Sequence, residues 1–160
     1  MLYIFDKDGT VIKSVPKANG GTRPPNTLDE QEAFEDVQAK MDDLLWQGHH
    51  RAMASNQGGV AYGIMTYDWA VTLMQDARIK TDMDSWRMCP YHPKGTVAEY
   101  TCNHPDRKPY PGMLWSLMSE YGFLPEQTVY IGDMDSDREA AVRAGVKFEW
   151  AWEFFGREKP

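Results

Sequence analysis

The sequence predicts an α/β fold in which helices flank a doubly wound parallel sheet. Two short apolar runs rich in β-forming residues, Leu2–Phe5 and Thr128–Ile131, are each followed closely by aspartate and glycine. Helical patterns separate these runs from the other strand candidates, and alternation of strands with helices favours a parallel sheet. Because ligands bind beyond the carboxyl ends of such strands, we expect the acidic segments after both runs to meet at one site.

The first half of the chain predicts a flap, two helices and a second strand. Residues 13–26 are rich in Gly and Pro and carry Lys and Arg, which is typical of a mobile flap beside a site. Thr27 or Asp29 is expected to cap a helix whose apolar residues recur at helical spacing as far as Gly48. Residues 51–54 then predict a strand that delivers Ser55 to the site, and Thr66 is expected to cap the next helix.

Weaker signals predict the elements of the second half. Residues 86–88 form a candidate strand, and Pro111 is expected to begin a helix that Gly122 ends. Ser136 is expected to cap a last helix that Gly145 ends, before a final strand over residues 146–150. No internal repeat and no interdomain linker interrupts this array, so residues 1–160 are expected to form one domain.

Composition limits the class of protein and its location. The 160 residues are 42% hydrophobic and carry a formal net charge of −7. No apolar run approaches membrane-spanning length, and a strand at residue 2 leaves no room for a signal peptide, so we expect a cytoplasmic protein without membrane contact. The negative charge disfavours a broad nucleic-acid-binding face, although a local basic patch stays open. A monomer or a small homo-oligomer is expected.

Four motifs in a fixed order carry the chemistry. Two carboxylates two residues apart at a strand end can converge on one hard cation such as Mg²⁺, which takes oxygen ligands. The same pattern returns after the second apolar run, so the sequence predicts one phosphoryl-transfer site. The motifs are Phe5-Asp6-Lys7-Asp8-Gly9-Thr10, Ser55-Asn56-Gln57, Arg107-Lys108-Pro109 and Gly132-Asp133-Met134-Asp135-Ser136-Asp137.

This set resembles the haloacid dehalogenase (HAD) superfamily of phosphatases, over nearly the whole chain from Leu2 to about Phe155. It is most similar to subfamily IIIA, which includes heptose bisphosphate phosphatases, histidinol-phosphate phosphatases and polynucleotide 3′-phosphatase domains. The clues to the subfamily are Ser55–Gly59, Cys89–Pro93 and Arg107–Met113. The resemblance implies a HAD-like, Rossmann-like fold. Neither interval between the motifs has room for a full cap domain, so we expect a capless single domain with an open site.

The resemblance also implies a role for each matching residue. Asp6 is the expected nucleophile, which forms an aspartyl-phosphate, and Asp8 is the expected general acid and base. Lys108 is expected to neutralise charge on the transferring group. Asp137 is expected to orient Lys108 or a metal-bound water, with Asp135 as the alternative. The implied phosphate- or substrate-binding residues are Thr10, Ser55, Asn56, Gln57, Arg107 and Lys108, and the implied Mg²⁺ ligands are Asp6, Asp8, Asp133 and Asp137.

The loop that holds both cysteines has two interpretations. Sugar-phosphate members of the subfamily often carry a structural zinc here, and this chain offers a shifted but chemically suitable set of two Cys and two His. Plain loop thiols are the alternative. The residues of the possible zinc site are Cys89, His92, Cys102 and His104.

We therefore expect a Mg²⁺-dependent phosphomonoesterase that acts on a small phosphorylated metabolite, such as a sugar phosphate or histidinol phosphate. Met134 stands where heptose bisphosphate phosphatases tend to place a Lys, which weakens the case for a bisphosphorylated sugar. One alternative is a 3′-phosphatase for nucleic-acid ends, since the aromatic tail 148–155 is similar to the end of some such domains. Another is a non-catalytic phosphate-binding module, against which the intact acidic motifs argue.

Overall fold

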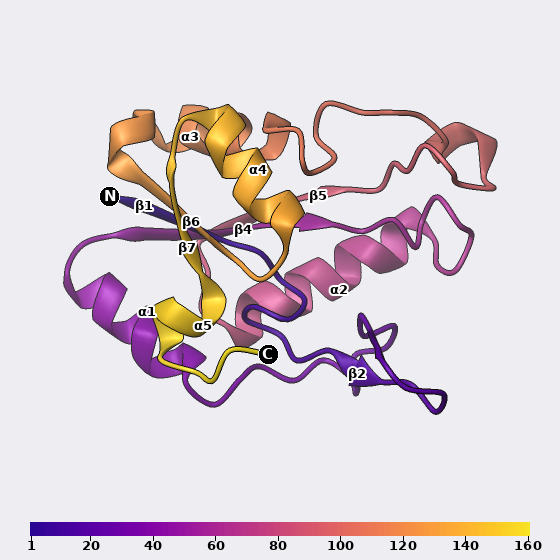
Figure 1. Ribbon diagram of the computed structural model, residues 1–160, viewed down its shortest axis with the longest axis horizontal. Coiled ribbons are helices and arrows are strands. Elements are labelled where there is room, and N and C mark those ends of the chain that lie inside the picture. The colour runs from indigo at the N-terminus through magenta and orange to yellow at the C-terminus, as the bar shows by residue number, and fades with distance from the viewer.

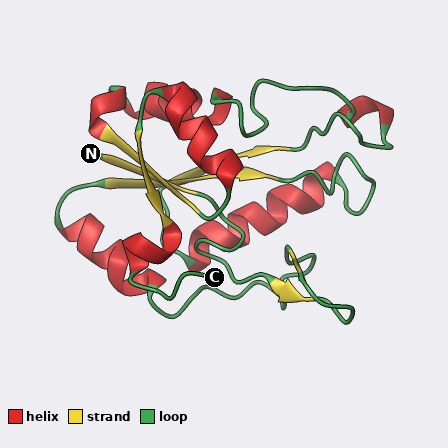
Figure 2. Ribbon diagram, in the orientation of Figure 1, coloured by secondary structure: helices red, strands yellow, loops and turns green.

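A five-stranded parallel sheet forms the centre of the computed structural model, which describes residues 1–160 (Figures 1 and 2). The strands lie in the order β5-β4-β1-β6-β7. The chain thus starts at the middle strand, moves to one edge and then builds the other, which confirms the doubly wound α/β sheet. The bounds are Leu2–Phe5 for β1, His50–Asn56 for β4, Ser85–Cys89 for β5, Thr128–Gly132 for β6 and Lys147–Trp150 for β7.

The register of the central strands brings their carboxyl ends level. Phe5, the last residue of β1, lies opposite Met53 of β4 and Ile131 of β6. The segments that follow these residues therefore emerge at one edge of the sheet. The central strands are largely buried, and most of their side chains are apolar before the chain reaches this edge.

Helices cover both faces of the sheet (Figure 1). On one face lie α3, Gly112–Tyr121, and α4, Asp135–Ala144. On the other lie α1, Val37–Trp46, α2, Tyr67–Lys80, and α5, Ala151–Phe155. Single-turn 3₁₀ helices occur at Ala98–Tyr100 and Pro125–Gln127. None of the helices is long and apolar enough to span a bilayer.

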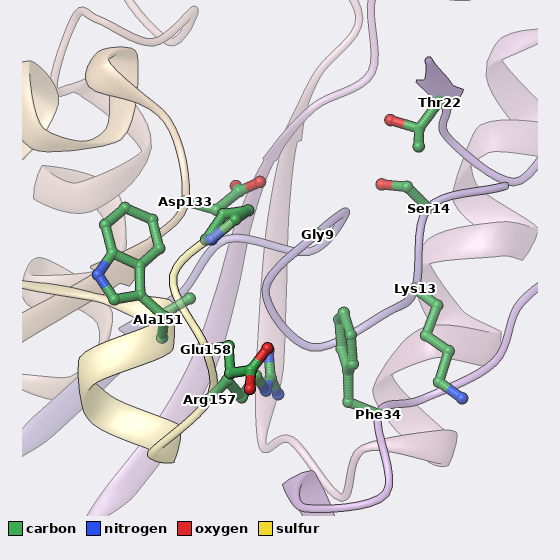
Figure 3. A pocket seen from close by; sticks show the side chains of 11 residues that line it. Gly9, Lys13, Ser14, Thr22, Phe34, Asp133, Ala151, Arg157 and Glu158 are labelled. Atoms are coloured by element: carbon green, nitrogen blue, oxygen red, sulfur yellow. The ribbon is translucent and has the colours of Figure 1, made fainter. Parts of the chain in front are cut away.

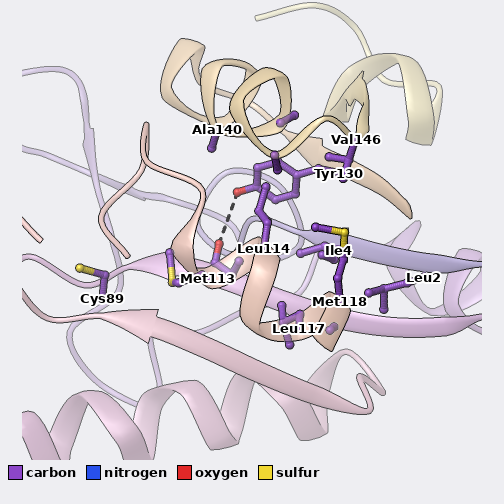
Figure 4. Packing of buried hydrophobic residues seen from close by; sticks show 14 residues of the cluster. Leu2, Ile4, Cys89, Met113, Leu114, Leu117, Met118, Tyr130, Ala140 and Val146 are labelled. Atoms are coloured by element: carbon purple, nitrogen blue, oxygen red, sulfur yellow. Dashed lines mark hydrogen bonds between the residues drawn. The ribbon is translucent and has the colours of Figure 1, made fainter. Parts of the chain in front are cut away.

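Each face of the sheet has its own hydrophobic core. Under α3 and α4, Leu114 and Leu117 pack with Ala140 against Ile4 and Tyr130 of the central strands (Figure 4). The core under α1, α2 and α5 contains the buried residues Phe5, Met41, Met53, Met74 and Phe155, among others. These two cores fix the central strands from both sides and so hold the edge that carries the motifs.

Most of the predicted helix ends are confirmed. Thr66 caps α2, since its Oγ1 accepts a hydrogen bond from the N–H of Trp69 at 3.1 Å. Pro111 directly precedes α3, and Gly122 ends it. Gly145 ends α4. The predicted strands 51–54 and 86–88 lie within β4 and β5.

Two predicted helix starts are wrong. The first helix begins at Val37 rather than near Asp29, because backbone hydrogen bonds from Lys13 to Glu32 and from Phe34 to Val11 hold residues 32–34 against the loop after β1. Such pairing between distant segments is invisible to helical periodicity.

The last helix begins at Asp135, so Ser136 lies inside α4 and is not its cap. The side chain of Asp137 instead accepts the N–H groups of Asp133 and Met134, at 3.2 and 3.0 Å. This carboxylate, from the third residue of the helix, satisfies the N–H groups of the two residues that precede the helix.

Residues 13–26, called the flap below, form a hairpin beyond the sheet, at the lower right of Figure 1. Its strands β2, Val15–Pro16, and β3, Thr22–Arg23, are antiparallel. Arg23 donates to both carboxylate oxygens of Glu30, at 2.9 and 2.6 Å, which fixes the base of the hairpin. No further domain stands over the carboxyl ends of the strands, so the capless expectation is confirmed.

Candidate active site

The four sequence motifs meet in one hollow at the carboxyl ends of the strands. Asp6 follows β1, Ser55 lies at the end of β4, Asp133 follows β6, and the loop before α3 supplies Lys108. The hollow has a volume of about 370 Å³. Side chains that line it include Asp6, Asp8, Ser55, Asn56, Arg107, Lys108, Asp133, Met134 and Asp137, together with Ser14, Thr22 and Arg23 of the flap.

Lys108 is the centre of the hydrogen-bond network in this hollow. Its Nζ lies 2.6 Å from Asp6 Oδ1, 2.7 Å from Asp137 Oδ1 and 3.0 Å from the carbonyl oxygen of Ala54. Burial alone would lower the pKa of the ammonium group, but the carboxylates of Asp137 and Asp6 outweigh burial and hold that pKa well above its usual range. Lys108 therefore remains a cation directly beside Asp6.

Tyr130 joins this network and was not among the predicted site residues. Its hydroxyl lies 2.9 Å from Lys108 Nζ and donates to Asp137 Oδ1 at 2.8 Å. Burial, followed by the charge of Asp137, raises the pKa of the phenol well above its usual range, so the proton stays on it. One signal in the sequence could have pointed to it. Tyr130 lies in a predicted buried strand of mostly apolar residues, and a buried phenol needs a polar partner.

Asp137 is the acid of the last motif that reaches the site. Its side chain is about 1% exposed, and both of its oxygens accept hydrogen bonds, from Lys108 and Tyr130 on one side and from backbone N–H groups on the other. A Cβ on Gly132 would lie 2.4 Å from the Cβ of Asp137, so only glycine fits there. Asp135 is exposed and lies 3.4 Å from Arg138.

An acidic cluster lies next to Lys108. Carboxylate oxygens of Asp6, Asp133 and Asp137 all fall within 4.8 Å of one another. Burial raises the pKa of Asp6 well above its usual range, and burial together with Asp137 raises that of Asp133. Gly9 makes this approach possible, because its φ is +88° and a Cβ there would lie 2.3 Å from Asp133 Oδ2.

The donors in this cluster fit a hard divalent cation such as Mg²⁺. Thr10 Oγ1 donates to Asp133 Oδ1 at 3.4 Å, and Asp133 has no basic partner. No hydrogen bond ends on the carbonyl oxygen of Asp8. The carboxylates of Asp6 and Asp133 thus offer the oxygen ligands that Mg²⁺ prefers, and the Asp8 carbonyl oxygen has no protein donor. Both oxygens of Asp137 already accept hydrogen bonds from protein donors. Asp137 therefore lies beside the metal ligands as the partner of Lys108.

Gln57 links the expected acid to the expected phosphate-binding hydroxyl. Its Nε2 donates to Ser55 Oγ at 2.8 Å and to Asp8 Oδ2 at 3.2 Å. The other oxygen of Asp8 accepts from Lys7 Nζ at 2.7 Å, and Lys7 is fully buried. These contacts hold the Asp8 carboxyl group in one orientation at the wall of the hollow. Lys7 and this use of Gln57 were not predicted.

Asn56 and Arg107 both line the hollow beside Lys108. The Asn56 side chain accepts from the N–H of Lys108 at 3.0 Å and donates to its carbonyl oxygen at 3.1 Å, so it clamps the loop. Arg107 is half-buried, and burial lowers the pKa of its guanidinium. Its one protein acceptor is the carbonyl oxygen of Tyr91 at 3.3 Å, which leaves a cation without a carboxylate partner at the hollow.

The zinc interpretation of the cysteine loop is not supported. Only the acidic cluster brings three metal-binding side chains within 4.8 Å of one another. His104 stacks on Tyr91 with ring centroids 4.3 Å apart, and its Nδ1 accepts the N–H of Asp106. Burial raises the pKa of the Cys89 thiol to about 11, while Cys102 is exposed. The loop packs through aromatic stacking, so Cys89, His92, Cys102 and His104 do not converge.

Comparison with known proteins agrees with this geometry. Residues 96–151 match the haloacid dehalogenase-like hydrolase family. A D-glycero-beta-D-manno-heptose-1,7-bisphosphate 7-phosphatase from Escherichia coli (strain K12) is 30% identical over 149 residues, which are 89% of this chain and 73% of that protein. The enzyme of the same name from Yersinia pestis is 29% identical over 147 residues, 89% of this chain and 74% of that protein.

Solved structures share the fold. A HAD-like phosphatase from Mesorhizobium loti superposes with a TM-score of 0.78 at 23% identity, covering 91% of this chain and 68% of that one. D,D-heptose 1,7-bisphosphate phosphatase from B. bronchiseptica, complexed with magnesium and phosphate, gives 0.73 at 24% identity, covering 92% and 78%. Since the E. coli relative matches over most of both chains, the protein belongs to the haloacid dehalogenase-like hydrolase family and is a phosphoric monoester hydrolase.

Proposed function

We propose that this enzyme is a Mg²⁺-dependent phosphatase that hydrolyses a small sugar phosphate through an aspartyl-phosphate on Asp6. The observation that carries the proposal is the 2.6 Å contact between Asp6 and the buried cation of Lys108, beside a second carboxylate, Asp133. Relatives that are named for a phosphorylated heptose support the choice of a sugar phosphate.

In the first step a carboxylate oxygen of Asp6 forms a bond to phosphorus, and the bond from phosphorus to the leaving oxygen breaks. Asp8, held by Gln57 and Lys7, gives its proton to that oxygen. Lys108 neutralises the charge that develops on the transferring oxygens, which is most effective in a site that is already organised. The Ser55 hydroxyl, fixed by Gln57, donates to a phosphoryl oxygen.

In the second step Asp8 takes a proton from water, which attacks the phosphorus, and the bond to Asp6 breaks to release phosphate. Asp6, Asp133 and the Asp8 carbonyl oxygen would hold Mg²⁺, which supplies positive charge next to the phosphoryl group. Asp137 and Tyr130 orient Lys108 toward Asp6, because both accept hydrogen bonds from its ammonium group.

A substrate with one phosphate suits this hollow. Met134 is 59% exposed at its edge and offers no charge to a second phosphate. Arg23 at the hollow is paired with Glu30, so besides Lys108 only Arg107 is a cation without a carboxylate partner, and it can donate to hydroxyl groups of the substrate beyond the transferred phosphate.

Phosphate release from a panel of sugar phosphates, histidinol phosphate, nucleotides and 3′-phosphorylated oligonucleotides tests the substrate class. We expect a sugar monophosphate to give the highest kcat/KM. A preference for the oligonucleotide of about a hundredfold at physiological salt, lost steeply as salt rises, would establish the nucleic-acid alternative instead.

Acid quenching during turnover tests the mechanism. With a ³²P-labelled substrate, wild-type protein is expected to carry acid-stable label on Asp6, and Asp6→Asn to carry none and to turn over at least about a thousandfold more slowly. Turnover by Asp6→Asn within about tenfold of wild type would refute the covalent mechanism.

A further inference from the structure

A second hollow adjoins the catalytic one, between the flap and the C-terminal segment. Its volume is about 430 Å³, and it shares Ser14, Thr22 and Asp133 with the catalytic hollow. In Figure 3, Ser14 and Thr22 lie on one side of the Gly9 loop, and Ala151 lies on the other. A group attached to a phosphate beside Asp133 can therefore extend directly into this second hollow.

Three polar side chains face the second hollow with no partner inside the protein. The hydroxyls of Ser14 and Thr22 and the carboxylate of Glu158 take part in no hydrogen bond or ion pair, and Figure 3 shows both hydroxyls directed away from the flap backbone. A hydroxyl both donates and accepts, and a carboxylate accepts. This set matches a ligand that carries several hydroxyl groups.

The cations at the second hollow are already neutralised. Lys13 pairs with Glu32 and Glu35. Arg157 donates to both oxygens of Asp36, at 2.7 and 2.6 Å. The free charge that remains in the hollow is therefore negative, from Glu158, and it disfavours a second phosphate on the ligand.

Aromatic side chains supply the apolar walls. Phe34 and Trp152 both line the second hollow. The guanidinium of Arg157 covers the Phe34 ring at 3.9 Å, and Trp150 stacks on Trp152 with centroids 4.6 Å apart, so neighbouring side chains hold both rings. Pockets of this kind, apolar with a few placed polar groups, are suited to orienting a small ligand.

We propose that the second hollow is the leaving-group subsite, which seats the neutral, hydroxyl-bearing ring of a sugar monophosphate between Phe34 and Trp152. The proposal rests on the phosphatase function proposed above and adds where the sugar lies and why a single phosphate is preferred. Glu158 and the two hydroxyls bind the sugar hydroxyls, and the walls exclude water from the ring.

The test compares two substrates in the full-length protein with Mg²⁺. One is the best sugar monophosphate of the panel, and the other is acetyl phosphate, whose leaving group has no hydroxyl and is too small to reach the second hollow. The variants are Ser14→Ala combined with Thr22→Val, and Glu158→Gln. Matched controls are Ser119→Ala and Glu153→Gln, which change exposed residues that do not line either hollow.

We expect each subsite variant to lower the ratio of kcat/KM for the sugar phosphate to that for acetyl phosphate by about tenfold, mainly through KM, because hydrogen bonds to the ligand are lost. The controls should leave the ratio unchanged. An unchanged ratio in the subsite variants, or an equal fall for both substrates, would overturn the subsite while leaving the phosphatase function intact.

Two further outcomes would overturn the proposal through the identity of the substrate. Hydrolysis of acetyl phosphate but of no sugar phosphate by the wild-type enzyme would overturn both the proposed substrate class and the subsite. A preference for histidinol phosphate that Glu158→Gln removes would assign the second hollow to a cationic amino alcohol and overturn the neutral-sugar proposal.

Discussion

Replacing Tyr130 with Phe tests how the buried lysine works. The three N–H groups of Lys108 Nζ face four acceptor oxygens within 3.0 Å, those of Asp6, Ala54, Asp137 and Tyr130. One acceptor is thus in excess. When one N–H of Lys108 turns to the phosphoryl group, the Tyr130 hydroxyl still donates to Asp137, so no buried carboxylate or carbonyl oxygen loses its hydrogen bond.

In Tyr130→Phe the number of acceptors equals the number of N–H groups. Loss of one hydrogen bond should lower the free energy of unfolding by about 1 kcal/mol, and Tm by roughly 2–4 °C for a chain of this size. When one N–H of Lys108 turns to the substrate in this variant, one buried acceptor oxygen is left without a donor. This adds about 1–3 kcal/mol to the activation free energy, so kcat should fall roughly ten- to hundredfold with KM little changed.

The assay measures kcat and KM for p-nitrophenyl phosphate beside a thermal melt followed by circular dichroism. Tyr121→Phe is the control, because Tyr121 packs on the core and its hydroxyl makes no hydrogen bond. A kcat within about twofold of wild type, with the expected fall in Tm, would refute the reasoning and leave Tyr130 with a role in stability alone.

The other predictions concern the loops around the site. Gly9→Ala places a Cβ 2.3 Å from Asp133 Oδ2 and should lower kcat about a hundredfold. Gly21→Ala is the control and should cost little activity, because Gly21 has a similar positive φ but no atom within 4 Å of the added Cβ. Equal effects of the two substitutions would contradict the steric argument. Arg157→Gln should lower the free energy of unfolding by about 2 kcal/mol, because a partly buried bidentate pair is lost, and an unchanged denaturant midpoint would argue against it. EDTA should abolish activity and added Mg²⁺ should restore it, whereas full activity in EDTA would exclude the metal site. Elemental analysis of protein purified without chelators should find no stoichiometric zinc; one zinc per chain would restore the Cys-His interpretation.

The sequence predicted the sheet and the catalytic motifs because their signals are local. Leu2–Phe5 and Thr128–Ile131 are continuous apolar runs, and parallel strands bring the acids that follow them to one edge. The four motifs gather in the hollow for that reason.

The features that were missed depend on contacts between distant segments. The start of α1 is set by pairing of residues 32–34 with the loop after β1, which no helical pattern records. In the sequence, Tyr130 is one more β-forming residue of its strand. Only the fold shows that α4 places Asp137 beside its hydroxyl. The zinc interpretation is not supported, because the four Cys and His side chains do not gather; His104 stacks on Tyr91, a contact that ligand spacing in the sequence does not reveal.

The bond from Arg157 to the carbonyl oxygen of Thr10, at 2.8 Å, has a practical consequence for anyone who expresses this protein. It secures the C-terminal segment against the loop after β1, while the amino group of Met1 contacts His49 at the opposite edge of the sheet. An affinity tag fused after Pro160 would begin at the mouth of the second hollow, where it could compete with ligands. A tag placed before Met1 would leave that mouth free, so kinetic work should start from the N-terminal fusion.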